Sequence, residues 1–184
     1  MIYTLEMLCD AYRKGNKYNF LFFWGHTPAK TGVIDKSCLS QWWMQNFTVD
    51  GVSYVCAEQY MMAEKACLFN DALMLEKIMQ AKHPKEMKAY GRKVKNFNAG
   101  VWDASCYGIV LKGSLAKFED NEDLRQFLLS THNRILVEAS PYDRIWGIGM
   151  RESDPDTPYP LKWRGKNLLG FALTEARDRL LLQV

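Results

Sequence analysis

The stretch Asn46–Phe69, NFTVDGVSYVCAEQYMMAEKACLF, carries the strongest structural signal in the chain because its periodicity changes part-way along. Residues 46–48 and 53–55 are β-rich runs on either side of Asp50-Gly51, a dipeptide typical of a two-residue hairpin turn. After Cys56 the residues Met, Ala, Glu and Lys prevail, and these are strong helix formers. The stretch therefore predicts a β-hairpin that leads directly into a helix.

Helical signals recur on both sides of this stretch. Leu5, Leu8 and Tyr12 lie at helical spacing, and Asp71 and Asn167 are candidate helix N-caps. Helices are therefore expected near the N-terminus, from Asp71 to about Gln80, from Pro84 to about Val94, near 101–117 and 121–131, and after Asn167. In the last helix, Glu175 and Arg179 are expected to form an i,i+4 pair on the surface.

Strand signals are fewer than helix signals. Tyr18–Trp24 is continuously apolar, which predicts a strand buried on both faces, and Arg134–Glu138 predicts a second short strand. The three prolines in Asp154–Pro160 exclude regular structure there. We therefore expect a mainly α fold with a small β-sheet built largely from the first third of the chain. The expected organisation is a helical extension over 1–17 and a single compact domain over 18–184.

Composition excludes several classes of protein. A net charge of +3 over 184 residues is too small for a dedicated DNA-coating protein, although brief contact with DNA or RNA is compatible. The five cysteines form no C-x-x-C and the three histidines form no H-x-x-x-H, so neither a disulfide framework nor a metal site is expected. No apolar run spans a membrane and the N-terminus lacks a secretory signal pattern, so a cytoplasmic protein without a cofactor is expected.

One face of the helix after the hairpin has the composition of a sugar pocket. Glu58 and Lys65 are seven residues apart, which places both on almost the same helical face, about 10 Å apart along the axis. Met61 and Met62 lie between them and would form an apolar floor. The alternative is a solvated charged face, which spacing alone does not exclude.

A second candidate region follows the strand at 134–138. Glu138–Gly149 gathers acidic, aromatic and glycine residues in a loop, where binding residues are common. The alternative is a tight turn whose Trp146 fills the core. Downstream, Arg151–Lys166 mixes prolines with four cations that would suit a diphosphate or a nucleic-acid backbone, unless the loop is merely solvated.

Taken together, these segments resemble the NADAR (YbiA-like) family. The matching blocks occur in family order and cover about Tyr18 to Leu182: Phe22-Phe23-Trp24-Gly25, Ser40-Gln41-Trp42-Trp43, Glu58-Gln59-Tyr60 with Ala63-Glu64-Lys65, Val101-Trp102-Asp103, Tyr142–Gly149 and Asn167–Gly170. Two positions depart from the family, which often has Ser and His where this chain has Ala57 and Gln59. Loss of a Ser cap costs a helix about 1 kcal/mol unless Ser53 or a backbone group replaces it.

The resemblance implies N-glycosidase activity without a metal or cofactor. The implied catalytic residues are Glu58, Lys65 and Asp143. The implied substrate-binding residues are Trp24, Gly25, Gln59, Tyr60, Trp102, Trp146, Gly147, Gly149, Arg151 and Asn167. The implied substrate is ADP-ribose attached to guanine, on nucleic acid or nucleotide, or alternatively a ribosylamino-pyrimidine phosphate of riboflavin synthesis. Two other classes stay open: a reader that binds ADP-ribose without turnover, and an interaction protein with an exposed aromatic patch.

These residue types suit the cleavage of a bond between ribose and a base nitrogen. Positive charge develops on the anomeric carbon and the base must leave with a proton, so a carboxylate and an acid are needed, for which Glu58 and Asp143 are candidates. An amine in an apolar site becomes nucleophilic, so Lys65 is a candidate for a Schiff base with the opened ribose. We expect Glu58 and Lys65 at opposite ends of the sugar, and Trp102, Asp143 and Trp146 in the same cleft.

Overall fold

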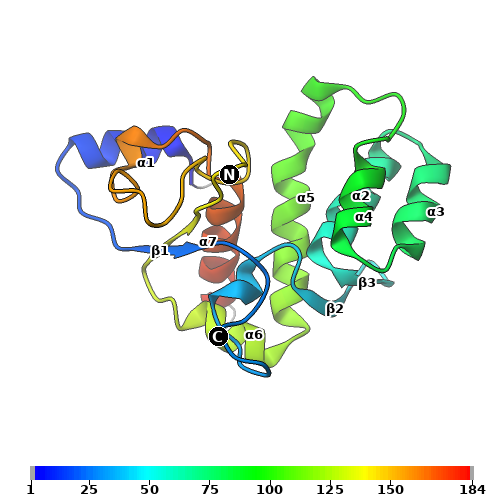
Figure 1. The fold of residues 1–184 in the computed structure, drawn as a ribbon, viewed down its shortest axis with the longest axis horizontal. Helices are drawn as coiled ribbons and strands as arrows, with labels where there is room; N and C mark the ends of the chain where they lie inside the picture. Colours follow the sequence, from blue (N-terminus) through cyan, green and yellow to red (C-terminus); the bar gives the residue numbers. More distant parts are fainter. Residues whose placement is uncertain (1–2, 183–184) are drawn as a thin grey trace. The chain divides into compact units, whose positions relative to one another are not determined.

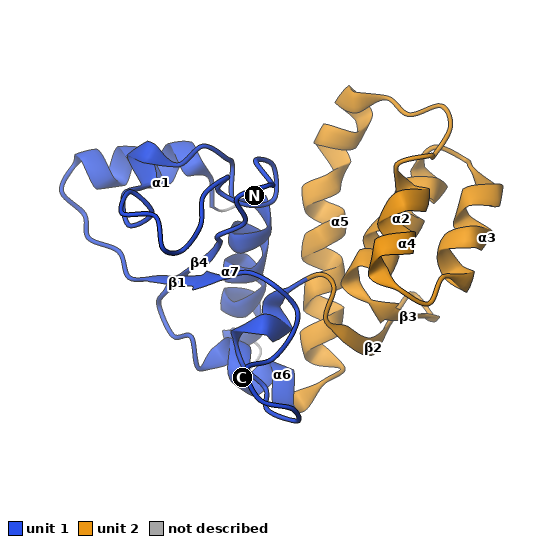
Figure 2. Ribbon diagram, viewed as in Figure 1, with its two compact units in different colours: residues 1–40, 123–184 blue, residues 41–122 orange. Residues whose placement is uncertain are grey.

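The computed structural model describes residues 3–182, and these form two compact units (Figures 1 and 2). Unit 2 is the continuous segment Gln41–Glu122, and unit 1 comprises the described residues before and after it. The mainly α prediction is confirmed, because seven α-helices account for about half of the described residues. No helix within residues 3–182 is long and apolar enough to cross a membrane.

Unit 2 begins with the predicted hairpin and continues with four helices. Its elements are β2 Met44–Val49, β3 Val52–Cys56, α2 Ala57–Leu68, α3 Ala72–Gln80, α4 Pro84–Gly91 and α5 Ala99–Glu119. The strands pair antiparallel, with Val49 opposite Val52, and Asp50 and Gly51 both have positive φ, as a two-residue hairpin turn requires. The hairpin and the helix after it are therefore confirmed.

Helix α2 is the centre of unit 2 and packs against α3, α4 and α5. Two glycines allow this close packing. A Cβ on Gly91 of α4 would lie 2.0 Å from the sulfur of Met62, and one on Gly113 of α5 would lie 2.4 Å from the ring of Tyr60. Because such distances are impossible, glycine at both positions permits neighbouring helices to approach α2, and its first seven residues are buried.

Unit 1 contains the two strands that flank unit 2 in sequence. Its elements are α1 Leu5–Arg13, β1 Phe20–Phe23, the 3-10 helix η1 Lys36–Leu39, α6 Glu122–Leu129, β4 Ile135–Glu138, the 3-10 helix η2 Pro160–Lys162 and α7 Leu168–Leu181. Strands β1 and β4 are parallel, with Phe23 opposite Glu138, and α7 packs on β4. Helix α1 packs against η2, so the residues predicted as an extension belong to unit 1, and the domain boundary at 17/18 stays a prediction.

Several local predictions need correction. The β-structure forms two separate two-stranded sheets, and β1 is mostly half-buried, because only Phe23 of its four residues is fully covered. Glu175 is fully buried rather than on the surface, although its ion pair with Arg179 is present at 2.7 Å.

Asn167 precedes α7 as predicted, but its side chain does not cap the helix. Instead, its amide oxygen accepts from the backbone N–H of Glu138, and its amide nitrogen donates to the carbonyl of Leu136, both at 3.0 Å. This buried residue has a φ of 55°, a conformation that Asn adopts more readily than most residues. Asn167 therefore joins the start of α7 to backbone groups of β4.

Candidate active site

The N-terminus of α2 holds Glu58 in the interior of the protein. The side chain is only 2% exposed, and its Oε2 accepts a hydrogen bond from the indole N–H of Trp42 at 3.1 Å. The N-cap of α2 is Cys56, so Ala57 lies inside the helix and a Ser there would not be the cap. The backbone N–H of Glu58 donates instead to the carbonyl of Gln41 at 2.9 Å. The alternative of a solvated charged face is therefore wrong for Glu58.

The next two residues of the motif are structural. The amide oxygen of Gln59 accepts from the backbone N–H of Val55, and its amide nitrogen donates to the carbonyls of Ile78 and Met79. Tyr60 is 1% exposed and makes an edge-to-face contact with the ring of Tyr54. Both side chains therefore contact other residues of unit 2. Their predicted roles in substrate binding would be to hold neighbouring residues in place rather than to touch the substrate.

Lys65, at the other end of α2, has its amine among aromatic rings. Its Nζ lies 4.3 Å from the ring centre of Phe97 and 5.4 Å from that of Trp102. Burial, followed by the like charge of Arg92, lowers the pKa of Lys65 from its ordinary value. A lowered pKa increases the neutral fraction of the amine, which is the form that acts as a nucleophile.

Lys65 and Glu58 form no ion pair within the described part of the chain, and the amine instead faces Phe97 and Trp102. Such a pair would have raised the pKa of the lysine. The sequence predicted Trp102 in the same cleft as Lys65. The residue is half-buried in the first turns of α5. Unit 2 therefore contains, on one helix, a buried carboxylate and an amine whose pKa is lowered.

In unit 1, two candidate segments leave the same edge of the parallel sheet. Trp24 and Gly25 follow β1, and the loop 139–149 follows β4, whose last residue pairs with the last residue of β1. The carboxyl ends of parallel strands commonly carry ligand sites in α/β proteins. Gly25 has a φ of 85°, and a Cβ at this position would meet no atom within 4 Å, so this backbone is open.

Asp143 organises the loop after β4. Its Oδ1 accepts from the backbone N–H groups of Ile145 and Trp146 at 2.8 and 2.7 Å, and its backbone carbonyl accepts from Gly149. A Cβ on Gly147 would lie 2.8 Å from the carbonyl of Glu138. The glycines here therefore bring the chain close to itself, and Trp146 is half-buried rather than a core plug.

Tyr142 is a residue that sequence reasoning did not single out. Its ring is 79% exposed and lies 6.1 Å from the ring of Trp24, which is 53% exposed. The two residues are 118 positions apart, and the parallel pairing of β1 with β4 brings their segments to one edge. A pair of exposed rings is unusual, because aromatic side chains normally bury most of their area.

Three exposed cations lie close to this loop. A Cβ on Gly149 would lie 3.0 Å from the side chain of Arg144 and 3.2 Å from Arg164, and the backbone N–H of Lys166 donates to the carbonyl of Arg144. None of the three cations forms an ion pair within residues 3–182. Arg151 is exposed as well, and its carbonyl accepts from the hydroxyl of Thr157.

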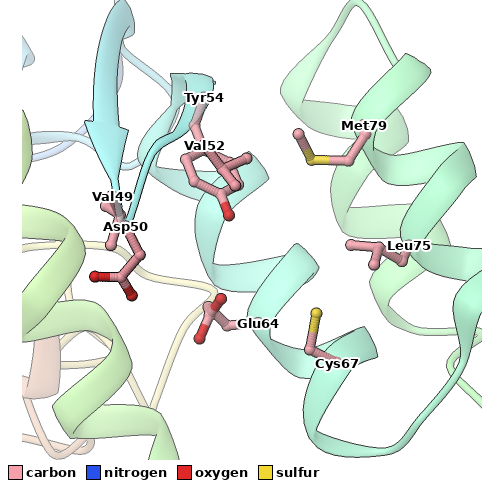
Figure 3. Close-up of a pocket in the computed structure, with 8 residues that line it drawn as sticks. All are labelled: Val49, Asp50, Val52, Tyr54, Glu64, Cys67, Leu75 and Met79. Carbon is pink, nitrogen blue, oxygen red and sulfur yellow. The ribbon is translucent and has the colours of Figure 1, made fainter.

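A separate cavity in unit 2 lies away from these groups. It has a volume of about 270 Å³ and is lined by Val49, Asp50, Val52, Tyr54, Glu64, Cys67, Leu75 and Met79 (Figure 3). On α2 it uses Glu64 and Cys67, which lie on a different side of the helix from Glu58 and Lys65. We therefore do not assign the chemistry of the protein to this cavity.

Similarity to known proteins identifies the family. Residues 22–181 match the NADAR domain family. The chain belongs to the NADAR family. N-glycosidase R617 of Acanthamoeba polyphaga mimivirus is 43% identical over 164 residues, which cover 86% of this chain and 95% of the viral protein. N-glycosidase YbiA of Escherichia coli is 30% identical over 135 residues, which cover 73% of this chain and 76% of that protein.

Two further relatives extend the comparison. The solved NMR structure of E. coli YbiA matches with a TM-score of 0.72 and 26% identity, covering 91% of this chain and 88% of that one. Protein irg-1 of Caenorhabditis elegans is 38% identical over 131 residues, which cover 70% of this chain and 62% of the worm protein. This NADAR member is therefore an enzyme of the YbiA-like N-glycosidase family, a family of hydrolases that act on N-glycosyl bonds.

The predicted site residues are distributed over both units. Glu58, Lys65 and Trp102 belong to unit 2, whereas Asp143 and Trp146 belong to unit 1. The expectation of one common cleft stays a prediction. Among residues 3–182, no group of three or more His, Cys, Asp or Glu side chains is arranged to hold a metal ion.

Proposed function

We propose that this NADAR protein removes ADP-ribose from modified guanine by hydrolysing the bond between ribose C1 and the base nitrogen. The observation that carries the proposal is the amine of Lys65, whose Nζ is 4.3 Å from the ring centre of Phe97 and whose pKa is lowered by burial. A lowered pKa increases the neutral fraction of the amine, and the neutral amine is the nucleophile, whereas the charged one is not.

In the proposed reaction, the neutral amine of Lys65 attacks C1 of the ribose, and the bond between C1 and the base nitrogen breaks. The base leaves with the bonding electron pair and takes up a proton. The ribosylated lysine then opens its sugar ring to an iminium, water adds to C1, and the C1–Nζ bond breaks to release ADP-ribose and the free amine.

The two carboxylates, Glu58 and Asp143, would donate a proton to the leaving base and stabilise the positive charge that develops on the anomeric carbon. Glu58 is buried beside the indole of Trp42, so its charge would act in a medium of low polarity, where electrostatic interactions are strong. In Asp143, Oδ1 is occupied by two backbone N–H groups, so a direct role in proton transfer would fall to Oδ2. Trp102 and Trp146 would stack on the ribose or the base.

The main alternative substrate is a ribosylamino-pyrimidine phosphate of riboflavin synthesis. The unit 1 surface favours a larger substrate than this, because it carries exposed rings at Trp24 and Tyr142. It also carries three exposed cations that form no ion pair within residues 3–182, namely Arg144, Arg164 and Lys166. Stacking rings beside a chain of cations are typical of surfaces that bind single-stranded nucleic acid. A reader module without turnover is disfavoured, since binding alone needs no amine with a lowered pKa.

The test is a trapping experiment with substitutions of Lys65. Wild-type protein is incubated with guanine-ADP-ribosylated DNA, or with a riboflavin intermediate, and sodium borohydride is added during turnover. We expect ADP-ribose release from the DNA and a reduced sugar adduct on Lys65. Lys65→Ala should abolish both, and Lys65→Arg should abolish both as well, because Arg keeps the charge but forms no imine.

Lys77→Arg, at an exposed position of α3, is the matched control and should retain full activity. A parallel arm with EDTA should leave the rate unchanged, because the described residues offer no ligand cluster for a metal. Substantial activity in Lys65→Arg without a trapped adduct would exclude the Schiff base and leave hydrolysis to the carboxylates. Turnover of the riboflavin intermediate alone would overturn the proposed substrate.

A further inference from the structure

Phe97 is an aromatic residue beside the proposed nucleophile to which no role has been assigned. It lies in the segment between α4 and α5, and its ring is 47% exposed. The neighbours of Phe97 in sequence, Asn96 and Asn98, are both polar and exposed.

The ring of Phe97 is held in place from two sides. It makes an edge-to-face contact with Phe69, whose ring is buried in the core of unit 2, at a centroid distance of 5.3 Å. Its loop is fixed by Asp71, whose Oδ2 accepts from the backbone N–H of Lys95 at 2.8 Å. On the following side, Asn98 caps α5 by accepting from the backbone N–H of Val101. The position of the ring is therefore determined by the fold rather than by a ligand.

The ring of Phe97 also lies close to the amine of Lys65. Of the two aromatic contacts of this amine, Phe97 at 4.3 Å is closer than Trp102 at 5.4 Å. The two rings together shield the amine from water, which disfavours its charged form, while their π faces favour the charged form. Burial is the largest cause of the lowered pKa of Lys65, and the like charge of Arg92 acts in the same direction.

We propose that Phe97 is a positioning residue that shields the amine of Lys65 and fixes its direction for attack. This inference rests on the proposed function only for the use of the amine, because the shielding itself is a property of the protein without substrate. Phe97 does not need to touch the substrate to act in this way. Its effect is on the protonation and the rotamer of the lysine.

Three substitutions of Phe97 separate the two physical effects of its ring. Phe97→Ala removes both the shield and the π face, so the amine becomes hydrated and charged. Phe97→Leu keeps an apolar shield but removes the π face, so the amine should stay at least as neutral as in the wild type. Phe97→Tyr keeps both properties and should behave like the wild type.

The readout is competitive acetylation of individual lysines with acetic anhydride as a function of pH, followed by peptide mass analysis. Near pH 7, we expect Phe97→Ala to lower the acetylation rate of Lys65 roughly three- to tenfold, because a rise in pKa reduces the neutral fraction. Phe97→Leu and Phe97→Tyr should keep the wild-type rate or exceed it. The exposed Lys77 provides an internal reference in every sample.

Leu73→Ala is the matched control, since Leu73 is a half-exposed apolar residue of unit 2 on α3. It should leave the acetylation of Lys65 unchanged. An unchanged rate in Phe97→Ala would overturn the inference, as would an equal loss in Phe97→Leu and Phe97→Ala. If acetylation shifts as expected but neither the wild type nor any variant releases ADP-ribose, the positioning role stands and the proposed function fails. If ADP-ribose is released but the acetylation of Lys65 is unchanged in Phe97→Ala, the proposed function stands and the positioning role fails.

Discussion

At the residue scale, Lys65 combines two opposing demands. A charged amine is stable in water, but a nucleophilic amine requires burial, and burial lowers the pKa of Lys65. Below the folded-state pKa the lysine is charged in both the folded and unfolded protein, so the folded state carries the full cost of shielding it. This cost falls as the pH rises through the folded pKa towards the unfolded value of about 10.4. Lys65 should therefore reduce stability at neutral pH.

Replacement of this lysine by an apolar residue of similar shape should stabilise the protein. We expect Lys65→Met to raise the free energy of unfolding at pH 7 by about 0.5 kcal/mol, a small value because the side chain is only half-buried. The gain should shrink as the pH approaches 10. Urea denaturation at several pH values measures this, with Lys77→Met as the exposed control. A loss of stability in Lys65→Met at pH 7 would show that the cation–π contacts dominate.

Spacing predicted only part of the site at this scale. Glu58 and Lys65 could be paired from sequence because they are seven residues apart on one helix. The contacts of Phe97 with Lys65 and of Tyr142 with Trp24 could not be predicted from spacing. Phe97 and Tyr142 each lie in a loop, and their partners are distant in sequence. Gln59 stands at a motif position, but its amide forms hydrogen bonds with three backbone groups of residues that the motif does not contain.

At the scale of elements, caps and turns decide where helices begin and how loops are held. Asp71 illustrates both roles, because its Oδ1 accepts from the N–H of Met74 at the start of α3 and its Oδ2 accepts from Lys95 in the loop that carries Phe97. The cap was predictable from the sequence, as was the Asp50-Gly51 turn, since both are local effects. The loop contact, and the commitment of Asn167 to β4 instead of α7, depend on segments that meet only after folding.

The pH dependence of stability should reveal the contribution of Asp71. Hydrogen bonds to its ionised form, first from Lys95 and then from Met74, lower its pKa. Because the pKa of Asp71 is lower in the folded state, the ionised carboxylate stabilises the fold at pH values above the pKa of the unfolded chain, about 3.9. This stabilisation is lost as the pH falls through the pKa of the folded state. We expect Asp71→Asn to be less stable than the wild type at pH 7, because an amide nitrogen cannot accept from a backbone N–H.

The difference between wild type and Asp71→Asn should therefore stay constant from pH 8 to about 5 and shrink below about pH 4. Chemical denaturation across this range is the measurement. Asp103→Asn, at an exposed position of α5, should show no such narrowing. A difference that is independent of pH down to 2 would mean that the charge of Asp71 does not contribute.

At the scale of the whole molecule, the net charge of +3 does not show how the cations are arranged on unit 1. Arg144, Arg164 and Lys166 are exposed close to one another because Gly149 and Gly165 allow their chain segments to approach, and a Cβ on Gly165 would lie 2.3 Å from the carbonyl of Gly147. Composition alone cannot reveal such a cluster, because it does not show which cations the fold brings together. The exposed rings of Trp24 and Tyr142 on the same unit give the cluster an aromatic neighbour.

This surface predicts that the protein distinguishes guanine-ADP-ribosylated single-stranded DNA from the same modified base in a mononucleotide. Flanking bases would stack on the exposed rings, at about 1–3 kcal/mol per base, and flanking phosphates would meet the cations. We expect a lower KM for the oligonucleotide, and this advantage should fall with rising salt. Tyr142→Ala should raise the KM for the oligonucleotide about tenfold and leave that for the mononucleotide unchanged.

Substitution of the cations separates charge from stacking. Arg164→Ala should reduce the slope of log KM against log salt by about 0.7 for the oligonucleotide, as expected for the loss of one phosphate contact, whereas Tyr142→Ala should leave the slope unaltered. Tyr12→Ala, which truncates an aromatic residue of α1, is the control for general effects on unit 1. Equal KM values for the two substrates at low salt would mean that the exposed rings and cations serve no nucleic-acid strand, because the electrostatic contribution is least screened under that condition and the stacking contribution does not depend on salt.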